Sequence, residues 1–228
     1  MVRVGLAMLQ GARHEHAEAL RAASQQLEIG IEIVELRSGL EVDESLDCLI
    51  LPGGESTAMR KASQSESLLS ALFSWMEQHP QRPVLGTCAG AILLANPGEG
   101  QASFLRAQIS RNAWGRQRDS FEAELDISLE IPSGELVPLE TAKRDQFNHQ
   151  PLPVGTHTVS RNMAKFHGVF IRAPRFDQSN IECEPVASFG DEVVGVLDGQ
   201  RLALTFHPEL TGDYRFHRWL LDKAHSVQ

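Results

Sequence analysis

The sequence has few cysteines and no long apolar run. Only three of its 228 residues are cysteines, Cys48, Cys88 and Cys183, and no two of them form a CxxC pair. A disulfide framework or a cysteine-rich zinc site is therefore not expected, and free thiols are typical of a reducing, cytoplasmic compartment. The apolar stretches are shorter than the roughly 20 residues that cross a bilayer, so no membrane span is expected.

Positive charge is also scarce. The 21 lysines and arginines are outnumbered by 30 aspartates and glutamates, which gives a net charge of −9. Such a chain has no general attraction for phosphate backbones or anionic membranes, so nucleic acid is not an expected partner. The first residues are basic and then apolar, but they continue into charged residues without a small-residue cleavage site. We interpret them as a first strand rather than a signal peptide.

The composition that remains is that of a globular protein with a sizeable core, 42% hydrophobic and 22% charged. A single domain spanning residues 1–228 is expected. In the first half, apolar periodicity predicts strands at 3–9, 29–36, 47–51 and 83–85, and helices at 14–27, 67–78 and 91–95. Strands that alternate with helices predict an α/β, flavodoxin-like fold with a mostly parallel sheet flanked by helices.

The second half has a different pattern. Residues 120–131 alternate between apolar and polar, which predicts a strand with one buried and one solvated face. Short strands are expected at 185–189, 193–197 and 201–206, with Asp198-Gly199 as a hairpin turn, and a helix at 212–224. These strands predict a small antiparallel addition. Between Leu136 and His167, three prolines and little periodicity predict a long surface loop.

One short motif indicates nucleophilic chemistry. Residues 86–90 read GTCAG, directly after an apolar strand, and so have the form G-x-C-x-G. This is the pattern of a nucleophile elbow, a sharp strand-to-helix turn whose crowded flanking positions favour glycine. The turn would lift the Cys88 sulfur above the sheet edge and place it at a helix N-terminus, which favours the thiolate. The alternative is a buried cysteine that serves as a small hydrophobic residue.

A nucleophilic cysteine needs a base and a group that orients the base. His207 follows an apolar strand and begins the sequence His207-Pro208-Glu209. Side chains two apart on an extended segment point the same way, so Glu209 could hold one imidazole nitrogen while the other faces Cys88. A surface turn is the alternative for these three residues taken alone.

The same chemistry needs hydrogen-bond donors for a developing oxyanion. The sequence LPGGES at 51–56 ends a predicted strand with two glycines, which leaves backbone N–H groups free to face a cleft. The alternative is an ordinary strand-to-helix turn with Ser56 as N-cap. The two interpretations are compatible.

Together these motifs resemble the class I, or triad, glutamine amidotransferases, and more narrowly the PdxT/SNO family of glutaminase subunits of pyridoxal 5′-phosphate synthase. The matching stretches occur in the family's order over nearly the whole chain: LQGA at 9–12 with Glu15-His16, LPGGEST at 51–57, GTCAG at 86–90, RNAWGRQ at 111–117, SFE at 120–122, FIRAP at 170–174 and FHPEL at 206–210. The cysteine and His-Pro-Glu motifs mark only the broad class. The segments PGGEST, RNxxGRQ and FIRAP restrict the resemblance to the PdxT/SNO family.

The resemblance implies that the chain hydrolyses L-glutamine to L-glutamate and ammonia. Cys88 would be the nucleophile, His207 the general base and acid, and Glu209 the residue that orients His207. Gly54 would supply an oxyanion N–H, and the glutamine-binding positions of the family correspond to Gly54, Glu55, Ser56, Arg111, Ile171 and Arg172. An arginine fork suits the α-carboxylate of glutamine. No cofactor or metal is implied for this reaction.

The resemblance also implies a partner, a (β/α)8-barrel synthase subunit that receives the ammonia and activates the glutaminase by docking. Gln10 and Gly11 correspond to part of the family's contact region. Residues 141–165 correspond to a loop insertion. Other hypotheses are a triad glutaminase serving another synthase, such as that of histidine biosynthesis, a non-catalytic partner subunit, and a cysteine peptidase or DJ-1-like protein on a similar scaffold.

Overall fold

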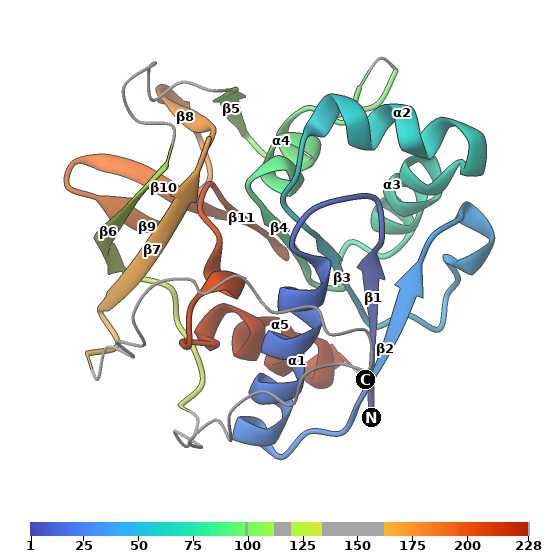
Figure 1. Ribbon diagram of the computed structural model, residues 1–228, viewed down its shortest axis with the longest axis horizontal. Helices are drawn as coiled ribbons and strands as arrows, with labels where there is room; N and C mark the ends of the chain where they lie inside the picture. Colours follow the sequence, from blue (N-terminus) through green and yellow to red (C-terminus); the bar gives the residue numbers. More distant parts are fainter. Residues whose placement is uncertain (99, 112–119, 134–161, 228) are drawn as a thin grey trace.

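A computed structural model describes residues 1–98, 100–111, 120–133 and 162–227. Nine of the strands form one sheet in the order β2-β1-β3-β4-β11-β10-β9-β6-β7, and two further strands, β5 and β8, form a separate sheet. Figure 1 shows the large sheet running through the molecule, with helices on both of its faces.

The first five strands of this order form the parallel half of the sheet. Their pairs β2–β1, β1–β3, β3–β4 and β4–β11 are all parallel. The strands are β1 (Val2–Ala7), β2 (Ile31–Leu36), β3 (Cys48–Leu51), β4 (Val84–Thr87) and β11 (Arg201–Leu204). Parallel strands end at the same edge of a sheet, so the loops that follow β1, β3, β4 and β11 are brought together there.

The other half of the large sheet is antiparallel. Strand β11 pairs with β10, and the pairs β10–β9, β9–β6 and β6–β7 continue the sheet in the same antiparallel sense. The strands are β6 (Ser120–Ile127), β7 (Lys165–Ile171), β9 (Glu184–Phe189) and β10 (Glu192–Asp198), and the separate two-stranded sheet consists of β5 (Ala107–Ser110) and β8 (Arg175–Ile181).

The helices lie in two groups on opposite faces of the sheet (Figure 1). Helices α1 (Arg13–Leu27) and α5 (Arg215–Val227) pack against each other on one face, and α2 (Ser56–Glu66), α3 (Leu68–Gln78) and α4 (Ala89–Ala95) cover the other. Two single-turn 3₁₀ helices, η1 (Gly39–Glu41) and η2 (Pro208–Leu210), complete the elements.

Strand β3 shows how the sequence builds the two cores. Its four residues are all completely buried. Cys48 and Ile50 contribute to the core under α1 and α5, whereas Leu49 and Leu51 contribute to the core under α3 and α4. A strand covered on both faces needs a continuous apolar run, because its side chains alternate between two dry layers.

The α/β fold class and most of the expected elements are confirmed, including the hairpin after Asp198, where Gly199 has a φ of +57°. The expected loop between Leu136 and His167 is wrong at its C-terminal end, because β7 already begins at Lys165. That strand pairs with β6 over its whole length, and cross-strand hydrogen bonds extend it beyond its apolar residues. Residues 141–161 of the expected insertion lie outside the described residues.

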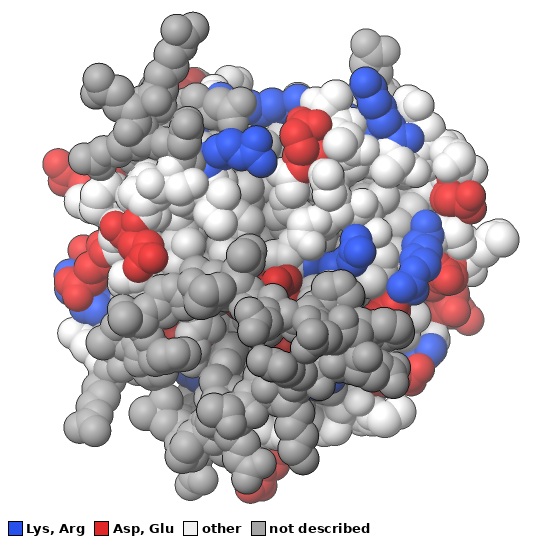
Figure 2. Space-filling model, viewed as in Figure 1, with Lys and Arg blue, Asp and Glu red and all other residues white. Residues whose placement is uncertain are grey.

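The surface in Figure 2 carries interspersed positive and negative side chains. On the part of this face formed by described residues, the basic side chains do not gather into one large area, in keeping with the net charge of −9. Among the helices of the described ranges, none is both long and apolar enough to span a membrane.

Candidate active site

Cys88 lies on the sharp turn between β4 and α4. It occupies the N-cap position of α4, with φ 49° and ψ −105°, a backbone conformation that non-glycine residues rarely adopt. The Cys88 N–H donates to the carbonyl of Leu204 at the end of β11, with a donor–acceptor distance of 2.8 Å. Backbone strain of this kind persists only where the surrounding structure fixes it, and it is concentrated at functional sites.

The two glycines that flank Cys88 are required by packing. A Cβ atom at Gly90 would lie 1.9 Å from the carbonyl oxygen of Leu51, and one at Gly86 would lie 2.6 Å from the Leu94 side chain. Both distances are far inside van der Waals contact. The G-x-C-x-G spacing therefore lets the start of α4 press against β3 and β4 beneath the thiol.

His207 and Glu209 lie beside Cys88. The Nδ1 atom of His207 is 2.7 Å from Oε1 of Glu209, and the His207 imidazole lies beside the Cys88 side chain, which helps to raise its pKa. All three residues are nearly buried, with 5–6% of their surface exposed. The backbone N–H of His207 donates to the carbonyl of Val169 in β7, at 2.8 Å.

The expected conformation of the His-Pro-Glu segment is wrong, although the residues it brings together are those expected. Glu209 does not lie two residues along an extended chain from His207. It lies in the 3₁₀ turn η2, which begins at Pro208, with His207 as its N-cap residue. The tight turn carries the carboxylate back beneath the imidazole, because a proline in the first helical position fits the required backbone angle.

Electrostatics hold this pair in its charged form. Burial by itself lowers the pKa of His207, but the charge of Glu209 and hydrogen bonds with Cys88 and Glu209 outweigh it and raise that pKa to about 10. Burial also opposes ionisation of Glu209, yet the imidazoles of His16 and His207 lower its pKa to about 2. Through neutral pH, Glu209 is a carboxylate and His207 holds a proton.

The double-glycine loop after β3 faces the same site. A Cβ atom at Gly53 would lie 2.4 Å from Cε1 of His207 and 3.4 Å from Cβ of Cys88. Gly54 has a φ of +144°, where glycine is favoured. The Gly53 carbonyl faces the Gly11 backbone, since a Cβ at Gly11 would lie 1.9 Å from that oxygen. The Gly54 N–H of the same trans peptide therefore points away from Gly11.

The loop is braced by the turn after β1. Gln10 accepts a hydrogen bond from the Glu55 N–H through Oε1, at 3.0 Å. Gln10 and Gly11, expected at a partner interface, thus contact the loop that carries Gly54, expected to bind the oxyanion, and Glu55, expected to bind glutamine. Glu55 rather than Ser56 caps α2, because its carboxylate accepts from the N–H groups of Thr57 and Ala58. The alternative interpretation of this turn, with Ser56 as N-cap, is therefore wrong in its capping residue.

The remaining expected glutamine contacts come from the antiparallel half of the molecule. Ile171 ends β7, and its carbonyl oxygen is 3.9 Å from the Cys88 sulfur. Arg172 follows with a φ of 44°, a second strained backbone beside the thiol. Arg111 follows β5 and donates to the Thr57 hydroxyl on α2, at 2.8 Å. Ile171 and Arg172 therefore lie on the Cys88 side of the sheet. Arg111 is hydrogen-bonded to α2, the helix that Glu55 caps.

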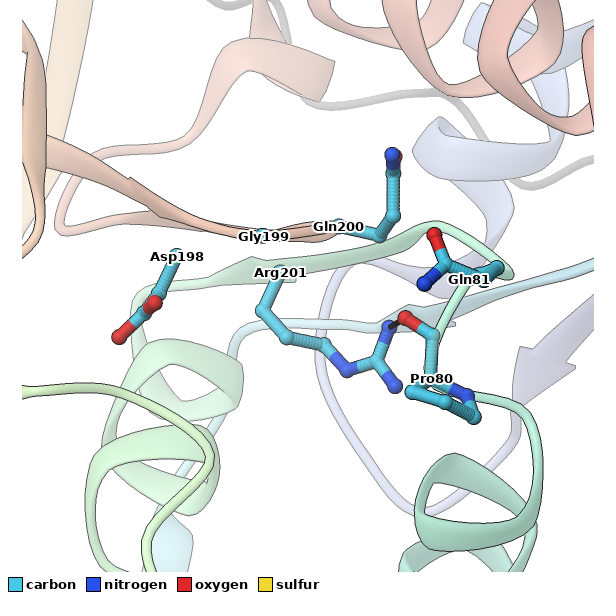
Figure 3. Close-up of a pocket in the computed structure, with 6 residues that line it drawn as sticks. All are labelled: Pro80, Gln81, Asp198, Gly199, Gln200 and Arg201. Atoms are coloured by element: carbon cyan, nitrogen blue, oxygen red, sulfur yellow. Dashed lines mark hydrogen bonds between the residues drawn. The ribbon is translucent and has the colours of Figure 1, made fainter.

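A separate surface hollow of about 380 Å³ lies at the opposite end of β4 and β11 (Figure 3). Six residues line it, Pro80, Gln81, Asp198, Gly199, Gln200 and Arg201. In Figure 3 the Arg201 guanidinium points toward Pro80, whose carbonyl it hydrogen-bonds together with those of Met76, His79 and Arg82. The Arg201 guanidinium therefore holds the C-terminal end of α3 and is not free for a ligand.

Comparison with known proteins identifies the family. The model of the SNO glutamine amidotransferase family matches residues 6–135 and 131–226, nearly the whole chain. This chain belongs to the SNO glutamine amidotransferase family. It is 38% identical to "Pyridoxal 5'-phosphate synthase subunit PdxT" of Thermococcus onnurineus, an alignment that covers 98% of this chain and all of that protein. The protein of the same name from Thermococcus gammatolerans is 35% identical over the same shares.

A solved structure gives the same result. "Crystal structure of glutamine amidotransferase" superimposes with a TM-score of 0.70 at 35% sequence identity, covering 97% of this chain and 98% of that one. The expected family is thereby confirmed, and with it the expected fold. The roles assigned to individual residues of this SNO family member remain predictions.

Three residues at the site were not among the expected site residues, although Gly53 and His16 lie in stretches that match the family. Gly53 contacts both His207 and Cys88, as described above, and His16 and His217 form a buried pair behind Glu209. A signal for His16 exists in the sequence, since it precedes Leu20 and Ala23 by four and seven residues and so lies on the buried face of α1. Within the described ranges, no group of three or more His, Cys, Asp or Glu residues could hold a metal ion.

The buried histidine pair makes stability sensitive to acid. Burial lowers the pKa of His16, and burial together with His16 lowers that of His217 to about 3. As the pH falls through about 6.5, the unfolded chain therefore takes up a proton at His217, whereas the folded protein does not until about pH 3. We expect His217 to cost about 2 kcal/mol of unfolding free energy between pH 7 and pH 5, and His16 to act in the same direction.

A His217→Gln variant keeps a donor toward His16 but removes one titrating group, so its loss between pH 7 and pH 5 should be smaller by about that amount. In both wild type and His217→Gln, His207 changes the free energy of unfolding in the opposite direction, because its pKa is raised in the folded state. The stabilisation by His207 is complete below pH 6.5 and is lost as the pH rises through about 10. Urea unfolding at the two pH values measures the difference. His225→Gln, at an exposed position of α5, is the control. Equal pH dependence in wild type and His217→Gln would contradict the account.

Proposed function

We propose that this chain is the glutaminase subunit of pyridoxal 5′-phosphate synthase, and that it hydrolyses L-glutamine through a thioester on Cys88. The observation that carries the proposal is the arrangement of Cys88, His207 and Glu209 on one strained turn and one 3₁₀ turn, within a chain that belongs to a glutamine amidotransferase family. The curated relatives named as synthase subunits match it over nearly their full length.

The first half of the reaction forms the thioester. The Cys88 sulfur attacks the side-chain amide carbon of glutamine, and the carbonyl oxygen becomes an oxyanion that the Gly54 N–H stabilises. His207 accepts the Cys88 proton, and its raised pKa of about 10 favours holding that proton until the amide bond breaks. When the carbon–nitrogen bond breaks, His207 delivers this proton to the leaving nitrogen, and ammonia departs.

The second half regenerates the thiol. Neutral His207 takes a proton from a water molecule, which attacks the thioester carbon and releases glutamate as the carbon–sulfur bond breaks. Glu209 serves both halves, because it holds the imidazole by Nδ1 and leaves Nε2 for the reacting groups. Arg111 and Arg172 would bind the α-carboxylate of glutamine, with Glu55, Ser56 and Ile171 completing the binding site.

The ammonia is passed to a (β/α)8-barrel synthase subunit that docks on this chain. The contact region includes Gln10 and Gly11, and these residues also touch the double-glycine loop. Docking of the partner at Gln10 and Gly11 can therefore change the position of the Gly54 N–H, because these residues contact its loop directly. No cofactor is needed for the glutaminase reaction.

The test is to incubate the purified chain with glutamine, with and without a candidate synthase subunit, and to measure glutamate. We expect slow release by the isolated chain and faster release once the partner is added. A non-catalytic subunit would release none in either case. A glutaminase of another synthase, such as that of histidine biosynthesis, would be activated by that enzyme and not by the pyridoxal 5′-phosphate synthase subunit.

Glu209→Gln is expected to be less damaging than His207→Ala, because an imidazole that is poorly oriented can still transfer protons. By analogy with triad enzymes, the glutamine variant should retain roughly 10- to 100-fold more activity than the alanine variant. Steady-state glutaminase rates measure this. Equal losses would mean that another residue orients His207.

A further inference from the structure

A chain of buried polar groups continues behind Glu209, on the side away from His207. Oε2 of Glu209 lies 3.5 Å from Nε2 of His16, which is also 3.1 Å from the Thr87 hydroxyl. Nδ1 of His16 lies 2.9 Å from Nε2 of His217. His16, Thr87 and His217 have no exposed surface, and they come from α1, β4 and α5. None of them has a part in the reaction as proposed.

The protonation of the two imidazoles follows from this geometry. If His16 carried its proton on Nδ1, its Nε2 lone pair would face the Glu209 carboxylate, and the His217 proton would lie on Nδ1, which has no hydrogen-bond partner in the described part of the chain. If His217 donates from Nε2 to His16 Nδ1, the His16 proton lies on Nε2 and faces Thr87 and Glu209. Only the second arrangement leaves no buried donor unpaired and sets no lone pair against a carboxylate.

The carboxylate needs this donor. Oε1 of Glu209 is bound by His207, but Oε2 is buried and has no hydrogen bond within normal distance among the described residues. Nε2 of His16 lies 3.5 Å from Oε2, slightly beyond that distance, and 3.1 Å from the Thr87 hydroxyl, so its N–H faces both oxygens. A buried carboxylate held at only one oxygen can rotate, and rotation would release the His207 ring from its productive orientation.

We propose that His16 is a positioning residue that holds Glu209 through Oε2, with His217 fixing its tautomer. This inference rests on the proposed role of Glu209 in orienting His207. It adds α1 and α5 to the elements that determine the geometry of the reacting groups. The charged groups nearest His16 are Glu209 and His207 in the site and Glu15 on its own helix.

Two substitutions separate this role from simple packing. His16→Leu fills the space but removes the donor, whereas the amide nitrogen of His16→Gln can take the place of Nε2. In the complex with the synthase subunit, His16→Leu should lower kcat by about 10- to 100-fold, the rate equivalent of one lost hydrogen bond to a charged acceptor. The KM for glutamine should change little, because His16 does not touch the substrate. His16→Gln should recover most of the lost kcat.

A matched control lies on the same helix. Gln26 is buried in α1 and accepts from Arg218 of α5 at 2.7 Å, so Gln26→Leu also removes a buried polar contact between these helices. It should lower the melting temperature and leave kcat unchanged. In a Glu209→Gln background, His16→Leu should have no further effect on kcat, because its partner is already altered.

A second measurement does not depend on turnover. The rate at which iodoacetamide alkylates Cys88, followed by peptide mass spectrometry against pH, reports the thiol and His207 as a pair. His16→Leu should shift this profile relative to wild type, and His16→Gln should restore it. If wild type alkylates normally but releases no glutamate, the proposed function fails and this measurement still tests His16. Wild-type kcat and an unmoved profile in His16→Leu, or equal impairment in His16→Leu and His16→Gln, would overturn the inference.

Discussion

Glutamate release is expected to fall to background in a Cys88→Ala variant, while the fold and the binding of the synthase subunit persist. The proposed thioester cannot form without the sulfur, and removal of a triad nucleophile costs about 10⁶-fold in kcat in comparable enzymes. The side chain is small, and alanine meets the same backbone demand at φ 49° as cysteine does. The free energy of unfolding should therefore change by less than about 1 kcal/mol.

Single-turnover glutamate assays and a binding measurement with the synthase subunit check both parts of this expectation. Cys183→Ala provides the control, because it removes another nearly buried thiol outside the site. That variant should keep wild-type activity. Ammonia release by Cys88→Ala would reject the assignment of the nucleophile, and loss of partner binding would mean that the variant has disturbed more than the reacting sulfur.

A single methyl group at Gly53 should be almost as damaging. The added Cβ would lie 2.4 Å from Cε1 of His207, so the imidazole or the loop must move. Displacement of a reacting group by about 1 Å commonly costs about 10²-fold in rate. We therefore expect Gly53→Ala to lower kcat by at least that factor while the protein remains folded, since the loop lies at the rim of the sheet and not in either core.

Gly30→Ala is the matched control, because a Cβ there would meet nothing nearer than the Met1 side chain at 3.9 Å. It should leave both kcat and the melting temperature close to wild type. The decisive comparison is kcat at saturating glutamine, with thermal unfolding measured on the same samples. A folded Gly53→Ala protein with normal kcat would show that the loop yields and that its contact with His207 does not control the base.

The sequence predicted the parallel half of the sheet well and the antiparallel half less well. Strands such as β3 are dry on both faces, so every residue of the strand is apolar. Strand β8 has polar side chains at most of its positions and is partly exposed, so no period-two pattern marks it. Helix α2 was missed as an element because only three of its residues, Ser56, Met59 and Ser63, are buried.

The residues of the candidate site were likewise predictable in some cases and not in others. Cys88, His207 and Glu209 could be selected because each lies in a compact motif with a chemical reason. Arg111 and Arg172 came only from the resemblance, because nothing in their local sequence separates them from other arginines. The contacts of Gly53 with His207 and of His16 with Glu209 join segments more than 150 residues apart in the chain, and such contacts follow from the sheet order and not from local pattern.

The position of β11 has a consequence for the newly made chain. The strand inserts between β4 and β10, with Leu204 beside Thr87, and only this pairing brings His207 to Cys88. A ribosome adds Cys88 more than a hundred residues before His207, the imidazole proposed to activate it. A fragment lacking residues 201–210 would keep the cysteine without the proposed proton acceptor, so we expect an incomplete chain to hydrolyse no glutamine.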